Sequence, residues 1–330
     1  MPVDKLGRSL QDLRVSVTDR CNFRCNFCMP DGKEYEFFRR EEILSFEEIA
    51  RVVRIVKGLG VKKVRLTGGE PLLRRHLENL IGMIREEVDD VALTTNGFLL
   101  KEKLESLFFA GLKRITVSLP SLKDETLSKI VGRQVKVNEI LEGIYKAIEL
   151  GVKIKVNVCV VKGLNHQEIL DFIKFFKPLG VEVRFIEFMD VGTVNGWSLD
   201  RVFSLGDILN VISERYKMEP LGRSKKGETA ERFSLEDGYT FGIIASITQP
   251  FCKECNRLRL TADGKLLTCL FASEGYDLKS LLRGGAKDEE IRDFIITLWE
   301  NRKDRYSEER LELLKRGQIP KKIEMFKIGG

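Results

Sequence analysis

The chain has 330 residues, 43% of them hydrophobic, so it can bury a full core in one large domain or in two unequal ones. Its 56 Lys and Arg residues against 50 Asp and Glu residues leave a net charge of +6, which gives no argument for nucleic acid or a membrane surface as a partner. The N-terminus lacks an apolar core and no apolar run approaches the length that spans a bilayer, so we expect a cytoplasmic protein outside the membrane.

Short runs rich in β-branched residues alternate with longer segments in which apolar residues recur every three or four positions. The short runs predict strands at Leu13–Thr18, Val61–Thr67, Val88–Thr95, Leu112–Leu119, Val152–Val161 and Val181–Phe188. The periodic segments predict helices at Phe46–Leu59, Arg75–Glu87, Glu102–Ala110, Val137–Leu150 and His166–Phe176. This repeat predicts an α/β fold with parallel strands, a partial (β/α)6 barrel that lacks two units of a full TIM barrel.

The repeat breaks down near Trp197, and the chain from Phe203 onward indicates one helix, a strand-rich stretch and then charged helices. We therefore predict a barrel domain over residues 1–205 and a C-terminal α+β extension over residues 206–330. In parallel barrels, ligand-binding groups gather at the C-terminal ends of the strands. The polar residues near those predicted ends are Arg65, Thr67, Thr94, Ser118, Asn157 and Arg184.

Six of the seven cysteines fall into two spaced triplets, which favours metal ligation in a reducing compartment over disulfides. The first triplet, Cys21, Cys25 and Cys28, has the spacing Cys-x3-Cys-x2-Cys. Because cubane iron–sulfur clusters normally take four thiolates, three thiolates with no fourth nearby leave one iron free to bind another ligand. The alternative, a structural zinc site, would need a distant fourth ligand. The seventh cysteine, Cys159, lies in an apolar run, where we expect a buried thiol that packs as a small hydrophobe.

The segment Thr67-Gly68-Gly69-Glu70-Pro71 follows the second predicted strand. Consecutive glycines let a backbone approach a ligand closely, and Glu70 offers a carboxylate to a ligand ammonium group. Taken alone, these residues also suit an ordinary turn between a strand and a helix.

The second triplet, Cys252, Cys255 and Cys269, has the spacing Cys-x2-Cys-x13-Cys and again lacks a fourth thiolate nearby. It predicts a second iron–sulfur cluster with an open iron in preference to a zinc ribbon. Arg257 and Arg259 place two guanidinium groups, which suit phosphate oxygens, beside that cluster. The alternative for these arginines is a strand whose alternate residues face water.

The first triplet and the Gly-Gly-Glu-Pro segment together resemble the radical S-adenosylmethionine (SAM) superfamily, in which SAM chelates the open iron of a 4Fe–4S cluster. With the second triplet, nearly the whole chain resembles the GTP 3′,8-cyclase family of molybdenum-cofactor biosynthesis. The stretches that match this family are Asp12–Cys21, Arg65–Leu72, Thr94–Gly97, Arg184–Met189, Phe251–Arg259 and the terminal Gly329-Gly330.

This resemblance implies a lyase that converts GTP to (8S)-3′,8-cyclo-7,8-dihydroguanosine 5′-triphosphate, with two 4Fe–4S clusters and SAM as cofactors. A 5′-deoxyadenosyl radical formed at the first cluster would take the C3′ hydrogen of GTP, and the carbon radical would attack C8 of guanine. The open iron of the second cluster would bind the purine and hold ribose and base in the geometry for cyclisation.

The resemblance also assigns site residues by matched position. It assigns contacts with SAM to Phe27, Gly69, Glu70, Ser118 and Met189. It assigns contacts with GTP to Arg14, Arg65, Thr94, Lys155, Arg257, Leu258 and Arg259. It implies catalytic roles for Arg257, Arg259, Gly329 and Gly330. Without the family, Lys155 would read as a strand residue facing solvent and Met189 as part of the core.

Partners follow from the resemblance alone: GTP as substrate, a second copy of the chain in a homodimer, and a downstream pyranopterin monophosphate synthase. The electron donor is not specified by any of these residues. Two other functions fit part of the pattern. One is a radical SAM enzyme that modifies a peptide, and the other is a non-catalytic metal-binding or electron-transfer protein.

Overall fold

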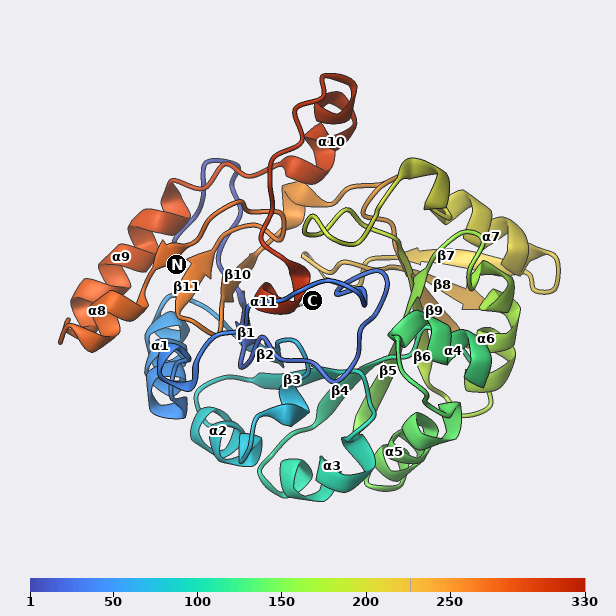
Figure 1. Cartoon of the computed structure of the whole chain (residues 1–330), viewed down its shortest axis with the longest axis horizontal. Coiled ribbons are helices and arrows are strands. Elements are labelled where there is room, and N and C mark those ends of the chain that lie inside the picture. The colour runs from blue at the N-terminus through green and yellow to red at the C-terminus, as the bar shows by residue number, and fades with distance from the viewer. Residues whose placement is uncertain (226, 330) are drawn as a thin grey trace.

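The structure of the chain is a computed structural model that describes residues 1–225 and 227–329. Lys226 and Gly330, the last of the residues predicted to be catalytic, lie outside the described residues. The strands form one sheet of twelve in the order β12-β11-β10-β1-β2-β3-β4-β5-β6-β9-β8-β7. This sheet curves around a central space without closing on itself (Figure 1).

The first six strands pair in parallel and in chain order, which confirms the predicted partial barrel. They are β1 (Asp12–Ser16), β2 (Lys63–Thr67), β3 (Asp90–Thr95), β4 (Arg114–Ser118), β5 (Lys153–Val160) and β6 (Glu182–Glu187). All six predicted strands are present, and their ends differ from the prediction by at most two residues.

Helices line the outside of these strands (Figure 1). They are α1 (Phe46–Gly58), α2 (Leu77–Ile84), α3 (Leu100–Phe109), α4 (Asp124–Val131), α5 (Val137–Glu149) and α6 (Ile169–Phe176). The five predicted helices are confirmed, although the predicted start of the last is a separate 3-10 helix, His166–Glu168. The prediction missed α4, because its eight residues bury only Leu127, Ile130 and Val131, too few to show a period.

Side chains of β5 alternate between the apolar core outside the barrel and its inner face. Its even-numbered residues, from Ile154 to Val160, are buried in the hydrophobic core between sheet and helices. Successive side chains of a strand point to opposite faces, so Lys155, Asn157 and Cys159 face the inside of the barrel. The inner face of β5 is therefore polar, and the apolar core lies between the sheet and the helices outside it.

The C-terminal part of the chain extends this sheet on both edges. Strand β9 pairs in parallel with β6, and β10 pairs in parallel with β1. The remaining strands are β7 (Met218–Gly222), β8 (Glu231–Leu235), β9 (Thr240–Ile244), β10 (Arg257–Leu260), β11 (Lys265–Leu267) and β12 (Tyr276–Asp277). The helices are α7 (Leu205–Ser213), α8 (Lys279–Arg283), α9 (Asp288–Glu300), α10 (Tyr306–Lys315) and α11 (Met325–Ile328). Other 3-10 helices are Arg40–Glu42, Pro71–Leu73, Leu199–Arg201 and Cys252–Glu254.

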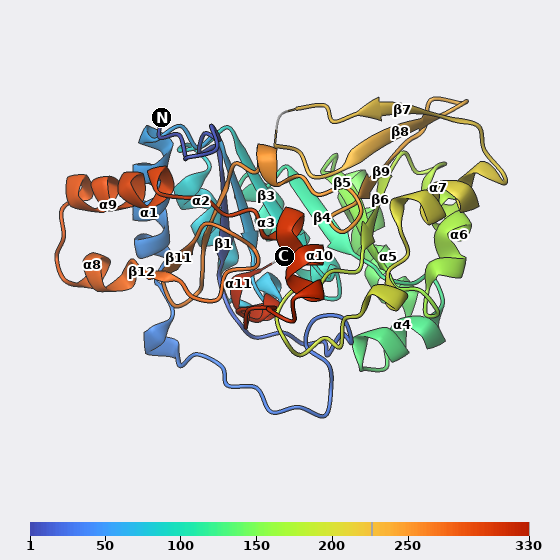
Figure 2. The same cartoon turned by 90° about the horizontal axis from the view of Figure 1, so that it is seen from above.

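The last helix, α11, lies at the centre of the barrel mouth, beside the long loop that follows β1 (Figures 1 and 2). Phe326 of α11 makes edge contacts with two aromatic rings of that loop, at centroid distances of 5.3 Å to Tyr35 and 6.0 Å to Phe37. The end of the described chain is thereby held against the loop that carries the first cysteine triplet. Among the described residues, no helix combines the length and apolar character needed to cross a bilayer.

Candidate functional site

The first cysteine triplet lies on the loop after β1, at the C-terminal end of the barrel. Its backbone is tied to the last turn of α4, because Arg24 N donates to Val131 O at 2.8 Å and Asn26 N donates to Ile130 O at 3.0 Å. Burial raises the pKa of the Cys21 thiol to about 11. Burial also raises the pKa of Cys25 and Cys28, and repulsion from neighbouring thiolates adds to it.

Those thiols fit a metal centre by their chemistry. Half-buried thiols that oppose one another's ionisation are stabilised as thiolates by a cation, and metal binding displaces their protons. Among residues 1–225 and 227–329, no three His, Cys, Asp or Glu side chains are placed to hold a single metal ion. A cubane cluster is a different ligand from a single ion, since its cysteines bind separate iron atoms.

The glycines of the Gly68-Gly69 segment pack directly against the chain that leads into the first triplet. A Cβ on Gly68 would lie 2.4 Å from Thr18 O, and one on Gly69 would lie 2.3 Å from Arg20 O. Gly69 N donates to Thr18 O, and Glu70 N to Arg20 O, both at 2.8 Å. Only residues without a side chain allow this contact, so the glycines join the two predicted SAM motifs into one unit.

Glu70 is fully buried and acts as the anchor of this unit. Its carboxylate accepts hydrogen bonds from Thr95 Oγ1 and Asn96 N, both at 2.7 Å, and from Leu72 N at 3.0 Å. Burial raises the pKa of Glu70 to about 7, although the three hydrogen bonds oppose the rise. Asn96 continues the link, because its Nδ2 donates to Asn22 Oδ1 at 2.8 Å, beside Cys21.

Other residues predicted to contact SAM lie around the same mouth. Asn195, a residue that the sequence did not single out, donates from Nδ2 to Met189 O at 3.0 Å and to Phe27 O at 3.4 Å. It thus brings together two of the predicted residues. Ser118, at the end of β4, is half-buried and lies in register with Asn157 of β5.

Two rows of charged residues cross the inside of the sheet. In the row nearer the N-terminal ends of the strands, Arg257, Asp12, Lys63 and Asp90 are aligned neighbours of alternating charge. Lys63 Nζ lies 2.8 Å from Asp12 Oδ2, so this row is internally neutralised.

The next row toward the mouth contains only positive charges. It aligns Arg259 of β10, Arg14 of β1 and Arg65 of β2. Within the described part of the chain none of these three forms an ion pair, and Arg14 Nε has no hydrogen-bond partner. Burial, with neighbouring arginines, lowers the pKa of Arg14 to about 10 and that of Arg65 and Arg259 to about 9, so all three remain charged at neutral pH.

Neutral groups hold the guanidinium of Arg65. Its Nη1 donates to Thr94 Oγ1 at 2.8 Å and to Thr116 Oγ1 at 3.2 Å. Thr94, predicted to contact GTP, therefore also orients Arg65. Thr116 was not predicted, because a threonine inside a strand carries no signal beyond strand propensity.

The other predicted GTP contacts lie farther around the barrel. Lys155 Nζ lies 2.9 Å from Glu182, which also pairs with Arg184 at 2.6 Å, and Arg184 reaches Glu228 at 3.0 Å. Leu258 is fully buried in the hydrophobic core, on the opposite face of β10 from its neighbouring arginines. Any contact of Leu258 with a ligand would therefore use its backbone.

The second cysteine triplet is assembled by the hairpin of β10 and β11. Cys252 and Cys255 precede β10 and Cys269 follows β11, so antiparallel pairing of these strands brings the three together. Burial opposes ionisation of Cys255, but Arg257 and Arg302 outweigh it and lower its pKa to about 6. Burial raises the pKa of Cys269 to about 12. This mixture of thiols and cationic groups also fits a metal cluster.

The C-terminal tail links the two ends of the site. Arg259 Nη1 donates to Gly329 O at 2.8 Å, and a Cβ on Gly329 would lie 2.3 Å from Thr67 Cγ2. Gly329 thus lies between the arginine row and the glycine segment. A buried network holds the chain that leads to it, in which Asp190 binds Arg310 at 2.7 Å and both Lys322 and Tyr306 at 2.5 Å.

The prediction that Cys159 packs in the core is wrong. The thiol is half-buried on the inner face of β5, because the alternation of the strand directs its even-numbered neighbours to the core. A thiolate at Cys159 would raise the pKa of Cys25 and Cys28, so it lies near the first triplet.

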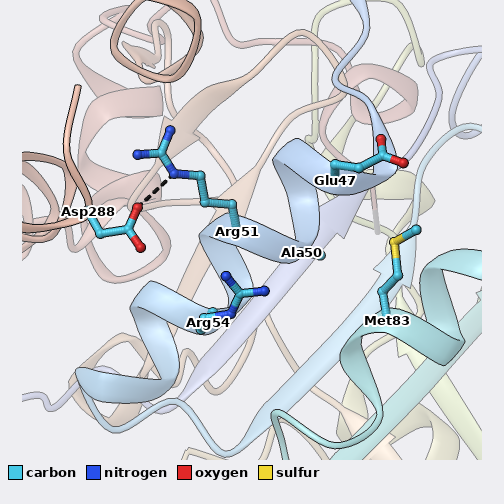
Figure 3. Close-up of a pocket in the computed structure, with 6 residues that line it drawn as sticks. All are labelled: Glu47, Ala50, Arg51, Arg54, Met83 and Asp288. Carbon is cyan, nitrogen blue, oxygen red and sulfur yellow. Dashed lines mark hydrogen bonds and ion pairs between the residues drawn. The ribbon is translucent and has the colours of Figure 1, made fainter. Parts of the chain in front are cut away.

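A surface hollow between α1, α2 and α9 contains none of these residues (Figure 3). It is lined by Glu47, Ala50, Arg51, Arg54, Met83 and Asp288. Arg51 Nε lies 2.7 Å from Asp288 Oδ1 and fixes α9 against α1, so the hollow is a seam between packed helices.

Known families match both halves of the chain. Residues 15–176 match the radical SAM superfamily, and residues 181–308 match the family described as Molybdenum Cofactor Synthesis C. The GTP 3′,8-cyclase of Aquifex aeolicus (strain VF5) is 53% identical over 100% of both chains. That of Staphylococcus haemolyticus (strain JCSC1435) is 45% identical over 99% of this chain and 98% of its own.

A solved structure of similar fold is SuiB of Streptococcus suis bound to S-adenosylmethionine, with a TM-score of 0.61 and 16% identity over 88% of this chain and 68% of that one. The open parallel barrel, the cysteine loop and the glycine segment define a radical SAM protein. At the identities just given, the chain belongs to the GTP 3′,8-cyclase family.

Proposed function

We propose that the chain is a GTP 3′,8-cyclase, a lyase that converts GTP to (8S)-3′,8-cyclo-7,8-dihydroguanosine 5′-triphosphate. The observation that carries this proposal is the row of arginines without ion pairs among the described residues, in which Arg259 is buried and Arg14 and Arg65 are half-buried. Burying charges without partners is costly unless a ligand compensates them. A triphosphate supplies several anionic oxygens, and guanidinium groups bind such oxygens by charge-assisted hydrogen bonds.

Position along the barrel supports this choice of ligand. Arg259 contributes to the electrostatic environment of the second triplet, whereas Gly329, bound to Arg259, touches the glycine segment beside the first triplet. A nucleotide bound to the arginine row would thus lie between the two cysteine triplets. The names of the relatives, GTP 3′,8-cyclases, agree with a nucleotide of this kind.

When bound, the first cluster and SAM supply a 5′-deoxyadenosyl radical. We propose that Cys21, Cys25 and Cys28 hold that cluster, and that the loop around Gly69 and Glu70 positions SAM with Phe27, Ser118 and Met189. Gly69 would do so through its backbone, and Glu70 chiefly by fixing the loop, since three hydrogen bonds already engage its carboxylate.

Further proposals concern the nucleotide and the second cluster. Lys155, Thr94, Arg257 and the backbone of Leu258 would complete the triphosphate site, with Gly329 closing it; the catalytic role predicted for Gly330 falls outside the described residues. Cys252, Cys255 and Cys269 would hold a second 4Fe–4S cluster, carried by residues 206–330 as a functional unit. We also propose a cytoplasmic homodimer whose product passes to a pyranopterin monophosphate synthase.

A direct test is mass spectrometry of the anaerobically reconstituted and reduced protein after incubation with SAM and GTP. We expect 5′-deoxyadenosine together with a nucleotide isomeric with GTP. Deoxyadenosine without that nucleotide would leave radical SAM chemistry in place and reject GTP as the substrate. Neither product, with iron and sulfide content confirmed, would favour a non-catalytic protein.

A matched pair of variants tests the arginine row. Arg14→Met removes a charge without a partner, whereas Arg114→Met removes a strand arginine that already pairs with Asp90. A hydrogen bond to a charged group is worth about 1.5–3 kcal/mol, so Arg14→Met should weaken GTP binding by about 10- to 150-fold. Isothermal titration calorimetry should find the affinity of Arg114→Met close to that of the parent; equal losses would reject the row as the nucleotide site.

A further inference from the structure

Two arginines far apart in sequence close over the Cys252–Cys255 turn of the second triplet. Arg8 Nη1 donates to Cys252 O at 2.8 Å. Arg302 Nη1 donates to Cys255 O at 2.6 Å, and its Nη2 donates to Cys255 Sγ at 3.1 Å. Each cysteine of the turn is therefore held by one guanidinium, but only Arg302 reaches a sulfur atom.

Asp4 joins these two arginines into a rigid group. Its Oδ2 lies 2.5 Å from Arg8 Nε and 3.4 Å from Arg302 Nη1. The exposed fractions of the three residues are 6% for Asp4, 2% for Arg8 and 4% for Arg302. The guanidinium of Arg302 also lies over the ring of Trp299, at 4.6 Å from the centroid. Packing and ion pairs thus fix the direction of the N–H bond toward sulfur.

Replacing either arginine by a neutral residue removes the same single positive charge from this group. Asp4 pairs with both, and Asp304 lies 3.5 Å from Arg302 Nε, so the group contains two cations and two carboxylates. Arg8 and Arg302 are equally buried and each donates to a cysteine carbonyl. Arg302 also contacts the Trp299 ring and Asp304, but among the two arginines only Arg302 donates a hydrogen bond to a cysteine sulfur, Cys255 Sγ.

We propose that Arg302 is a positioning residue for the second cluster: its N–H group withdraws electron density from Cys255 Sγ and raises the reduction potential of the cluster. Hydrogen bonds to cysteine sulfur are among the factors that set the potentials of iron–sulfur clusters. Such a bond stabilises the reduced, more negative cluster more than the oxidised one. This inference rests on the proposed second cluster.

The test uses a background variant in which Cys21, Cys25 and Cys28 are replaced by Ala, so that only the second triplet can take a cluster. After anaerobic reconstitution with iron and sulfide, its reduction potential is measured by a redox titration followed by electron paramagnetic resonance. Arg302→Met and the matched control Arg8→Met are compared in this background. Each variant removes one buried guanidinium, but only Arg302→Met removes the bond to sulfur.

We expect Arg302→Met to shift the potential to a more negative value and Arg8→Met to leave it near that of the background protein. If circular dichroism shows that Arg302→Met is unfolded, Arg302→Gln replaces it. Its side chain keeps an amide donor but is shorter, and it should shift the reduction potential in the same direction. Equal potentials in the Arg302 and Arg8 variants would overturn the inference and leave the second cluster in place. Failure of both Arg302 variants to fold would assign Arg302 a purely structural role. A background protein without iron or sulfide would overturn the second cluster itself.

Discussion

Gly329→Ala tests whether the described end of the chain must reach the glycine segment. Gly329 has φ of +71°, a left-handed conformation that glycine adopts freely. An added Cβ would lie 2.3 Å from Thr67 Cγ2, 2.9 Å from Thr67 Oγ1 and 3.1 Å from Gly68 N. The substitution therefore strains the backbone and places a methyl group where the glycine segment already lies.

Both costs can be estimated. A left-handed conformation costs a residue with a Cβ about 1–2 kcal/mol, and overpacking by a methyl group costs about 1–3 kcal/mol. The docked tail should therefore lose about 2–5 kcal/mol, which corresponds to a factor of at least about 30 in its docking equilibrium. If the tail undocks instead of accepting the strain, it loses the hydrogen bond from Arg259 to Gly329 O. Loss of that hydrogen bond costs about 1.5–3 kcal/mol.

Hydrogen exchange followed by mass spectrometry measures this effect without any assumption about activity. Peptides that contain α11 should exchange at least about tenfold faster in Gly329→Ala, because a strained tail opens more often. Product formation from GTP should fall by a similar factor, whereas the midpoint of global unfolding should stay constant, since chain ends contribute little to the core.

Gly317→Ala is the matched control. Gly317 also has a positive φ, +64°, but a Cβ there would meet nothing within 4 Å. It carries the backbone cost without the clash, and it should preserve both the exchange of α11 and product formation. If Gly329→Ala retained the exchange rates of the parent, or if Gly317→Ala lost product equally, the steric reasoning would be refuted.

Two further predictions concern buried carboxylates. Asp190→Asn removes the shared partner of a buried ionic network and should lower the free energy of unfolding by about 3–5 kcal/mol in urea denaturation, whereas Glu312→Gln, from an exposed pair, should change it by less than about 1 kcal/mol. Comparable losses would contradict this. Burial raises the pKa of Glu70 from 4.5 to about 7, so the native state binds more protons than the unfolded state between these values and loses stability as pH rises through them. In urea denaturation of the metal-free proteins, the free energy of unfolding of Glu70→Gln should rise relative to that of the parent by about 3 kcal/mol between pH 4.5 and 7.5. A difference between the two proteins that does not change with pH would contradict this.

Features that depend on neighbours in sequence could be predicted from the sequence. The alternation of β5 and the period of α1 and α5 predicted element type correctly, because side-chain direction repeats within a few residues. The spacing of the first cysteine triplet predicted a cluster loop because its three thiols lie close together in the sequence. The short α4 was missed because too few of its residues are apolar to set a period.

Features that depend on contact between distant segments appeared only in the tertiary structure. Arg14 and Arg259 become neighbours because β10 pairs with β1, and Gly329 reaches the glycine segment because α11 lies in the barrel mouth. Likewise, nothing near Arg302 in the sequence indicates that it donates to Cys255 Sγ. The sequence by itself therefore determined the kinds of element and the local ligand spacing, through periods of two and 3.6 residues. The tertiary structure decided which charges lie side by side without partners, because strand pairing joins residues that no local period relates.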